Sequence, residues 1–444
     1  MTLIERVWGL LSLSALLFFV SGCSNSSQNE TPHGSILSVS TVGGSNNERG
    51  SSVVTATDQG YAILGYTQSN DGDVTDKTDT SFDYWVVKYK ADHTIEWQKT
   101  YGGSGNDRGR SIIQTLDGGY ALIGSSSSTD GDVSNNSGQL DFWMVKLDSS
   151  GNISWENSFG FPGNDEGISL IQTSDLGYLL IGVLDVTGSG GEGNTRASSR
   201  HAGGDYWAVK VSASGELEWS RYFGGNFTDT PEGVIQLPDE GYIIAGGSDS
   251  EDTDISNNIG TYDFWVIRIS SDGDLIWERS FGGTQIDEAR AIVASNDGNY
   301  LIVGDTRSND VMVSSNNGAA DVWLIKITPS GNLIWEKNYG GSDFDTAQDI
   351  VKLNDGYVIT GSSRSADGDV AVNKGQNDLW VFKIDFEGNL IWEQSVGGSN
   401  IDFGYGVTFL NNGSVVSVGD TGSTDGDITE NKGFTDLLLA IIND

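Results

Sequence analysis

A motif of about 58 residues recurs along most of the chain, and this repeat constrains the fold more than any other feature. Each copy ends in a glycine, and the closing glycines are Gly43, Gly102, Gly160, Gly224, Gly282, Gly340 and Gly397. The intervals between them are 59, 58, 64, 58, 58 and 57 residues. A nearly fixed period of this length predicts a repeat architecture from residue 43 onward, without a second fold.

Each repeat contains four short segments that are typical of β-strands. In the copy that spans residues 102–160, these segments are residues 110–115, 120–124, 141–147 and 153–159. Turns rich in Gly and Asp separate them, together with a long polar loop. Apolar runs of this length, bounded by Gly and Asp, predict strands that are buried on both faces. Four antiparallel strands per repeat predict the blade of a β-propeller, which is an all-β fold.

The two ends of the repeat array complement each other. Six copies carry a tryptophan on the fourth strand, five residues before the closing glycine: Trp97, Trp155, Trp219, Trp277, Trp335 and Trp392. The last copy stops at residues 436–444 without a fourth strand, whereas residues 35–42 form an additional strand before the first copy. If this N-terminal strand completes the last blade, the ring has no exposed edge between its ends. We therefore predict a closed seven-bladed β-propeller over residues 35–444.

Several phrases recur in the blades: Gly-Gly-Ser-x-x-Asp, Asp-Gly-Gly-Tyr-x-x-x-Gly and Asp-x-Trp-x-x-Lys-x-Asp-x-x-Gly-Asn. They resemble the seven-bladed β-propeller repeat (SBBP-type) of bacterial secreted and surface proteins. The resemblance covers residues 35–444. It implies a scaffold for binding or surface interaction, and the family has no defined active site whose residues could be carried over to this chain.

The N-terminus has the features of an export signal. Arg6 precedes an apolar run at residues 7–20, which is too short to span a bilayer. The run ends in Val20-Ser21-Gly22-Cys23, which resembles the lipobox of bacterial lipoproteins. The resemblance implies cleavage before Cys23 and lipidation of this cysteine. Residues 1–22 are therefore predicted to form a lipoprotein signal peptide, and residues 23–34 a flexible tether.

The predicted location is the envelope of a bacterium, with the lipid anchor as the sole membrane attachment. Ser24 follows Cys23 where an aspartate would imply retention in the inner membrane, so the outer membrane is favoured. Acidic residues outnumber basic ones by 62 to 24, which gives a net charge of −38. Because such a field repels phosphate, nucleic acid is excluded as a partner. We expect a monomer.

Four loops between the second and third strands share an Asp-Gly-Asp motif. Its carboxylates are Asp71, Asp73, Asp130, Asp132, Asp367, Asp369, Asp425 and Asp427. Closely spaced carboxylates are the hard oxygen ligands that Ca²⁺ prefers, so these residues are candidate calcium ligands. The dipeptide Asp-Gly is also common in turns, and the sequence leaves both interpretations open. With these loops on one face of the disc, that face is expected to be strongly acidic.

The third repeat carries an insertion at residues 184–204, which accounts for the interval of 64 residues. It contains a small basic group, Arg196, Arg200 and His201, in an otherwise acidic chain. These three residues form a candidate loop for a ligand or partner. The alternative is an insertion that the fold tolerates without any function.

The sequence provides little for catalysis. His33, His93 and His201 are its only histidines, and no cluster of them suggests a zinc site. We therefore predict a non-catalytic binding scaffold for a protein partner or a polysaccharide at the cell surface. The alternative is an extracellular polysaccharide hydrolase or lyase that uses carboxylates at the mouth of the channel. A deep pocket with acids converging from unlike blades would favour this enzyme.

Overall fold

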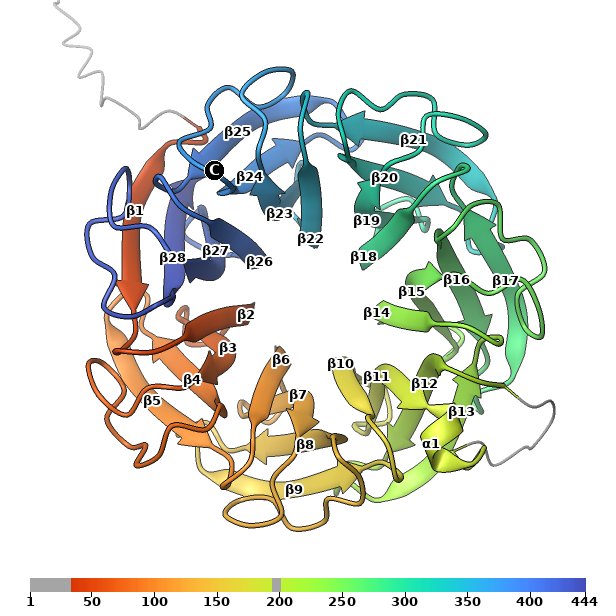
Figure 1. The fold of residues 1–444 in the computed structure, drawn as a ribbon, viewed down its shortest axis with the longest axis horizontal. Coiled ribbons are helices and arrows are strands. Elements are labelled where there is room, and N and C mark those ends of the chain that lie inside the picture. The colour runs from red at the N-terminus through yellow and green to blue at the C-terminus, as the bar shows by residue number, and fades with distance from the viewer. Residues whose placement is uncertain (1–32, 194–200) are drawn as a thin grey trace, which may run out of the picture. The chain divides into compact units, whose positions relative to one another are not determined.

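The computed structural model describes residues 33–193 and 201–444, and residues 33–444 form one compact unit. Its described residues form seven four-stranded antiparallel sheets that surround a central opening (Figure 1). The prediction of a seven-bladed β-propeller is therefore confirmed. The predicted signal peptide, Cys23 and most of the tether lie outside the described residues.

In each blade, the four strands follow one another in order from the channel to the outer rim. The innermost strands are β2 (Glu48–Thr55), β6 (Asp107–Gln114), β10 (Glu166–Gln172), β14 (Asp229–Gln236), β18 (Asp287–Ala294), β22 (Asp345–Lys352) and β26 (Asp402–Phe409). The second strands are β3 (Tyr61–Thr67), β7 (Tyr120–Ser126), β11 (Tyr178–Asp185), β15 (Tyr242–Ser248), β19 (Tyr300–Thr306), β23 (Tyr357–Ser363) and β27 (Ser414–Thr421).

The outer half of each blade is equally regular. The third strands are β4 (Asp83–Tyr89), β8 (Asp141–Leu147), β12 (Gly204–Val211), β16 (Asp263–Ile269), β20 (Asp321–Ile327), β24 (Asp378–Ile384) and β28 (Asp436–Asn443). The outermost strands are β5 (Ile95–Tyr101), β9 (Ile153–Phe159), β13 (Leu217–Phe223), β17 (Leu275–Phe281), β21 (Leu333–Tyr339), β25 (Leu390–Val396) and β1 (Ile36–Val42). One short helix, α1 (Val186–Ser189), occurs in the described part of the chain, which contains no helix long and apolar enough to cross a membrane.

The N-terminal strand closes the ring, as predicted. The last sheet has the strand order β1-β28-β27-β26, and β1 pairs antiparallel with β28 from Ile36 opposite Ile442 to Val42 opposite Leu437. The main-chain nitrogen of Gly34 donates to the carbonyl oxygen of Asn443 at 2.7 Å. Strand β1 therefore supplies the outer edge of the last blade.

Aromatic side chains connect neighbouring blades through the core. Trp143 on β8 is fully buried and packs against Tyr84 on β4, with ring centroids 4.6 Å apart. The hydroxyl group of Tyr84 donates to the carbonyl oxygen of Trp143 at 2.9 Å. Tyr206 and Trp265 repeat this arrangement farther around the ring. The third-strand tryptophans thus stabilise the junctions between blades as well as the blades themselves.

The outer strands also contact the next blade. The hydroxyl group of Tyr101 donates to the carbonyl oxygen of Gly151 at 2.7 Å, and the ring of Trp97 lies against the same glycine. Gly151 has a φ of 75°, and a Cβ atom there would lie 2.8 Å from the Trp97 ring. This turn therefore requires glycine, both for its backbone conformation and for the close approach of the ring.

The innermost strands differ from the sequence-based prediction. The strand expected at residues 110–115 begins at Asp107, and Arg108 pairs with Ser125 on β7. The carboxylate of Asp107 accepts hydrogen bonds from the Ser126 hydroxyl and from the main-chain nitrogen of Gly103. The start of the strand is thus held by a buried side chain rather than by β propensity, so its Gly- and Asp-rich sequence resembles a turn.

Candidate binding site at the channel mouth

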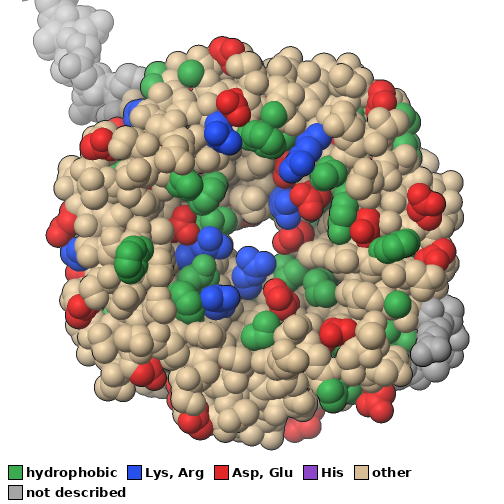
Figure 2. Space-filling model, in the orientation of Figure 1, with side chains coloured by type: hydrophobic (Ala, Val, Ile, Leu, Met, Phe, Trp, Pro, Cys, Tyr) green, Lys and Arg blue, Asp and Glu red, His purple; other side chains and the backbone are tan. Residues whose placement is uncertain are grey.

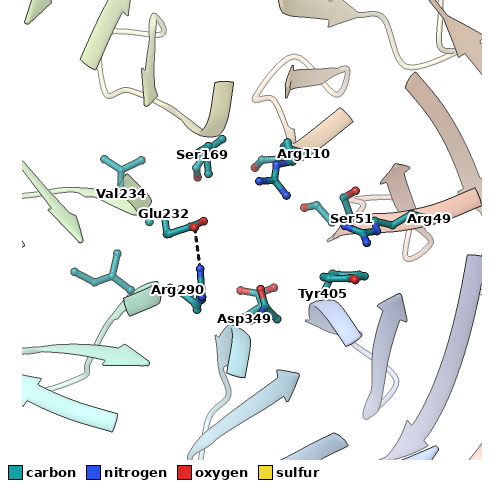
Figure 3. A pocket seen from close by; sticks show the side chains of 16 residues that line it. Arg49, Ser51, Arg110, Ser169, Glu232, Val234, Arg290, Asp349 and Tyr405 are labelled. Carbon is teal, nitrogen blue, oxygen red and sulfur yellow. Dashed lines mark hydrogen bonds and ion pairs between the residues drawn. The ribbon is translucent and has the colours of Figure 1, made fainter. Parts of the chain in front are cut away.

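Each innermost strand contains a β-bulge at the same position, and one residue there is left out of the ladder. These seven residues, which we call the bulge ring, are Ser51, Arg110, Ile168, Glu232, Arg290, Gln348 and Tyr405. All seven line a cavity of about 200 Å³ in the central channel (Figure 3). Bulges commonly re-aim a side chain, and here they direct one from every blade into the channel.

The residues of the bulge ring differ from blade to blade. The residue before the bulge is small in most blades, as Gly50, Gly109 and Gly167 illustrate. The bulge residue itself is a serine, an isoleucine, a glutamate, a glutamine, a tyrosine or one of two arginines. A residue that maintains the blade should recur in every blade. The bulge ring therefore has the asymmetry expected of a functional site.

Arginine is concentrated near this end of the channel. Of the nine arginines in the described residues, six lie here: Arg49, Arg108, Arg110, Arg290, Arg307 and Arg364. The first four line cavities in the channel. The other two directly follow β19 and β23, at the ends of these strands that pair with the starts of β18 and β22.

The distribution of charge on this face differs from the prediction. Lys and Arg side chains gather around the opening of the channel together with some Asp and Glu side chains, and further Asp and Glu side chains are spread over the surrounding face (Figure 2). The centre of the face that was expected to be strongly acidic therefore holds both basic and acidic side chains. The chain's net charge of −38 did not indicate this, because net charge does not tell where the few cations lie.

Two of these arginines are held between aromatic rings. The guanidinium carbon of Arg49 lies 4.0 Å from the ring centroid of Tyr405 and 5.6 Å from that of Tyr66. The guanidinium carbon of Arg108 lies 5.7 Å from the same Tyr66 ring and 4.4 Å from that of Phe82. Stacking of this kind fixes the guanidinium planes and leaves their N–H edges available for ligands.

Arg49 has an ion-pair partner, whereas Arg110 has none among the described residues. The Nε atom of Arg49 lies 3.0 Å from a carboxylate oxygen of Asp420 on β27. Burial opposes the charge of Arg49, but Asp420 outweighs this and raises its pKa, so the residue stays protonated. Arg110 is exposed to the channel and has no hydrogen-bond or ion-pair partner among the described residues. Its charge is thus available to a ligand.

On the opposite wall of the channel, one arginine lies among three acidic side chains. Arg290 lies 3.2 Å from Glu232 and 2.8 Å from Glu288, and its Nε atom is 3.7 Å from Asp305. Burial raises the pKa of Asp305 to about 6 and also raises that of Glu232. Arg290 is thus engaged by carboxylates, whereas Arg110 on the basic wall of β2 and β6 has no ion-pair partner among the described residues.

Asp349 is the other acid in the cavity, and it has a structural role. Its carboxylate accepts hydrogen bonds from the main-chain nitrogens of Ile350, at 2.8 Å, and of Val407 on β26, at 2.9 Å. Burial raises its pKa to about 6. Asp349 therefore links β22 to the neighbouring blade. The geometry as a whole is suited to hold an anion against Arg108 and Arg110, with neutral hydroxyl groups nearby.

The structure gives the Asp-Gly-Asp motifs a role in turns. In the first blade, Asp71 accepts a hydrogen bond from the main-chain nitrogen of Ser45 at 2.8 Å, and Asp73 accepts one from that of Gly43 at 3.0 Å. The other motifs repeat both bonds, through Asp130, Asp132, Asp367, Asp369, Asp425 and Asp427. Within the described ranges, no group of three or more His, Cys, Asp or Glu side chains is placed to hold a metal ion. Calcium binding stays a prediction.

The insertion is placed only in part. Arg196 and Arg200 lie outside the described residues, whereas His201 is 6% exposed and its Nδ1 bonds to the carboxylate of Asp205. In the second blade, the equivalent Asp141 accepts a hydrogen bond from the main-chain nitrogen of Ser137 instead. His201 thus replaces a backbone donor where the insertion changes the loop, which is a structural role.

The comparisons with known proteins give distant matches. No family model matches the chain. The regulatory protein FlaEY of Caulobacter vibrioides is 24% identical over 301 residues, which are 61% of this chain and 30% of that protein. An uncharacterized WD repeat-containing protein of Acanthamoeba polyphaga mimivirus is 24% identical over 310 residues, which are 60% of this chain and 22% of that protein. The matched regions thus span less than a third of these relatives.

Solved structures of low sequence identity are also similar to the chain. The WD40 domain of Neurospora crassa Pan2 has a TM-score of 0.47 and 8% identity, and the match covers 92% of this chain and 97% of that one. Puromycin hydrolase has a TM-score of 0.47 and 13% identity, covering 88% and 53% of the two chains. None of these likenesses is close enough to carry a function over to this protein.

Proposed function

We propose that the protein is a non-catalytic binding scaffold whose ligand binds at the channel mouth through the basic wall formed by Arg49, Arg108 and Arg110. The observation that carries this proposal is the bulge ring, because its equivalent positions differ from blade to blade and all seven line the channel cavity. The exposed guanidinium group of Arg110, which has no partner among the described residues, supports an anionic group in the ligand.

The carboxylates of the channel support binding rather than catalysis. Glu232 is paired with Arg290, and Asp349 accepts hydrogen bonds from two main-chain nitrogens. A general acid or base needs to reach a substrate, and these groups are already engaged. The names of the two sequence relatives, a regulatory protein and a WD repeat-containing protein, agree with a scaffold.

Citrate is a suitable first probe, because it presents several carboxylates in a small volume. We expect citrate to raise the melting temperature of the protein at low ionic strength, and the double variant R108Q/R110Q to lose this rise. K352Q is the matched control, because Lys352 is exposed at the other end of an innermost strand. If citrate stabilises the double variant and the parent protein equally, binding at the channel mouth is refuted.

The location of this scaffold is a second part of the proposal. The lipobox-like Val20-Ser21-Gly22-Cys23 supports export and anchoring to the outer membrane through Cys23. In a bacterial host, the parent protein should fractionate with membranes, whereas C23S should be soluble or retain its signal peptide. A C23S variant that fractionates with membranes and is processed normally would contradict the lipid anchor.

A polysaccharide hydrolase or lyase is the second candidate, and one observation favours it. Glu232, Asp349 and Tyr405 come from three unlike blades and line the same cavity (Figure 3). This is the asymmetry expected of an enzyme. Incubation with polygalacturonate would release reducing ends or unsaturated uronates if the protein cleaves it, and E232Q should then abolish the release. An inactive parent protein would leave the scaffold as the better proposal.

A further inference from the structure

We infer that the ligand of the channel mouth is a small saccharide bearing a carboxylate, or the end of a longer acidic glycan. The inference rests on the proposed function and names the ligand class of the same site. In this arrangement, the carboxylate binds the guanidinium edges of Arg108 and Arg110, and the sugar hydroxyl groups bind the serines of the channel wall.

The charge distribution determines how an anion can approach. Lys and Arg side chains gather around the opening, with some carboxylates among them, and acidic side chains are scattered over the rest of the face (Figure 2). A long polyanion lying across this face would be repelled along most of its length, whereas a compact anion or one end of a chain could reach the arginines at the opening. The site therefore favours a ligand that enters the channel over one that lies across the disc.

The size of the site sets a second limit. The two cavities lined by Arg49 and Arg110 have volumes of about 200 and 240 Å³. Pockets that enclose drug-sized ligands span roughly 300–1,000 Å³. The channel mouth is therefore suited to one or two sugar rings, and a folded protein domain cannot enter it.

The wall beside the arginines is rich in neutral polar groups. Ser51, Ser52, Ser111, Ser169 and Gln348 all line the cavity of about 200 Å³. The hydroxyl oxygen of Ser51 is buried and has no hydrogen-bond partner among the described residues. Such groups are satisfied by ligand hydroxyls, whereas the methylene groups of an acidic peptide would leave them unpaired. This favours an acidic sugar over an acidic peptide.

The aromatic rings nearby predict how the sugar is held. The rings of Tyr66, Phe82 and Tyr405 are stacked with Arg49 and Arg108. Their stacked faces are thus not free to take a sugar ring, and recognition relies on hydrogen bonds and charge. A neutral sugar lacks the carboxylate that the arginines require, so it should bind much more weakly than the corresponding uronate.

Isothermal titration calorimetry of the purified protein tests this inference. The probes are glucuronate, galacturonate and its trimer, glucose, and triglutamate. We expect the uronates to bind at least roughly tenfold more tightly than glucose and triglutamate. We expect R110Q to lower the affinity for the uronates roughly tenfold. K352Q should bind like the parent protein. Tight binding of the trimer alone would identify the end of a glycan as the source, and binding of the monomer would identify a free sugar acid.

The outcomes separate this inference from the proposed function. Uronates that bind no better than glucose overturn the acidic-sugar inference, and so does tighter binding of triglutamate. The proposed scaffold survives either result if citrate still stabilises the parent protein and not R108Q/R110Q. If R110Q binds uronates as tightly as the parent protein does, the assignment of the carboxylate to the basic wall is wrong.

Discussion

Asp263 on β16 and Asp287 on β18 face each other across Gly282, although both side chains are carboxylic acids and both are fully buried. A Cβ atom on Gly282 would collide with an oxygen of each. Burial, with a contribution from Asp287, raises the pKa of Asp263 to about 7, and burial raises that of Asp287 as well. Like charges this close cannot both be ionised without cost, so the pair favours one proton.

The same arrangement recurs around the ring and predicts how stability depends on pH. Burial raises the pKa to about 6 in the corresponding third-strand residues Asp83, Asp205, Asp321, Asp378 and Asp436. Because the folded pKa lies above the unfolded value of about 3.9, the folded state holds more protons between these values. Stability should therefore fall as pH rises from about 4 through 7, by up to about 1.4 kcal/mol per pH unit for each group that loses its proton. Urea unfolding at pH 5, 6, 7 and 8 measures this.

The variant D263N separates the buried pair from the overall charge. Asparagine cannot ionise, so the stability of D263N should depend less steeply on pH than that of the parent protein. At pH 8, D263N should be at least as stable as the parent protein. D272N is the control, because Asp272 is exposed and its replacement removes one surface charge only. Equal pH dependence in the parent protein, D263N and D272N would refute the role of the pair.

The architecture could be predicted from sequence because its determinants recur at a fixed spacing. The fourth-strand tryptophans, such as Trp97, lie against glycine turns of the next blade, so a constant sequence distance reflects a constant junction. The strand before Gly43 and the missing strand after Asp436 likewise predicted the closure by β1 and β28. Repetition thus identifies what maintains the fold.

The candidate site could not be predicted in the same way. A bulge adds one residue to the strand, so the alternation that marks a strand fails at Arg110 and at its equivalents. The preceding residues, such as Asp107 and Gly109, resemble a turn. A signal was nevertheless present, because the third residue after the first-strand Asp or Glu changes from blade to blade, whereas that Asp or Glu itself recurs. The insertion was the more visible asymmetry, and the structure buries His201 within it.

Asp425 tests whether the Asp-Gly-Asp motifs act as hydrogen-bond acceptors or as calcium ligands. It accepts a hydrogen bond from the main-chain nitrogen of Ser399 at 2.7 Å. D425A should lower the free energy of unfolding by about 1 kcal/mol, because that nitrogen loses its partner. If the motif is only an acceptor, a chelator leaves the melting temperature of the parent protein unchanged. A fall on chelation that calcium reverses would establish the calcium site.

His201 should matter for stability rather than for ligand binding. Its ring is the side-chain partner of the buried Asp205, and it stacks edge-on against Tyr222 with centroids 4.9 Å apart. H201A leaves the carboxylate without this donor and should lower the free energy of unfolding by about 1–3 kcal/mol. Urea unfolding measures the loss, with citrate binding to the channel as the second readout. H201A with parental stability and impaired binding would assign His201 to the ligand site.

Closure of the ring by β1 predicts the effect of removing it. Without residues 33–42, the edge of β28 loses its partner strand, and Leu437 and Leu439 no longer pair with Val42 and Ser40. An exposed apolar edge strand pairs readily with other chains. We therefore expect the truncated protein to aggregate and to melt lower by on the order of 5 °C or more, measured by size-exclusion chromatography and calorimetry. A variant that lacks only residues 24–32 keeps β1 and should behave like the parent protein. A truncated protein that stays monomeric with an unchanged melting temperature would show that the ring does not need this strand, because the other six blades then suffice to hold it closed.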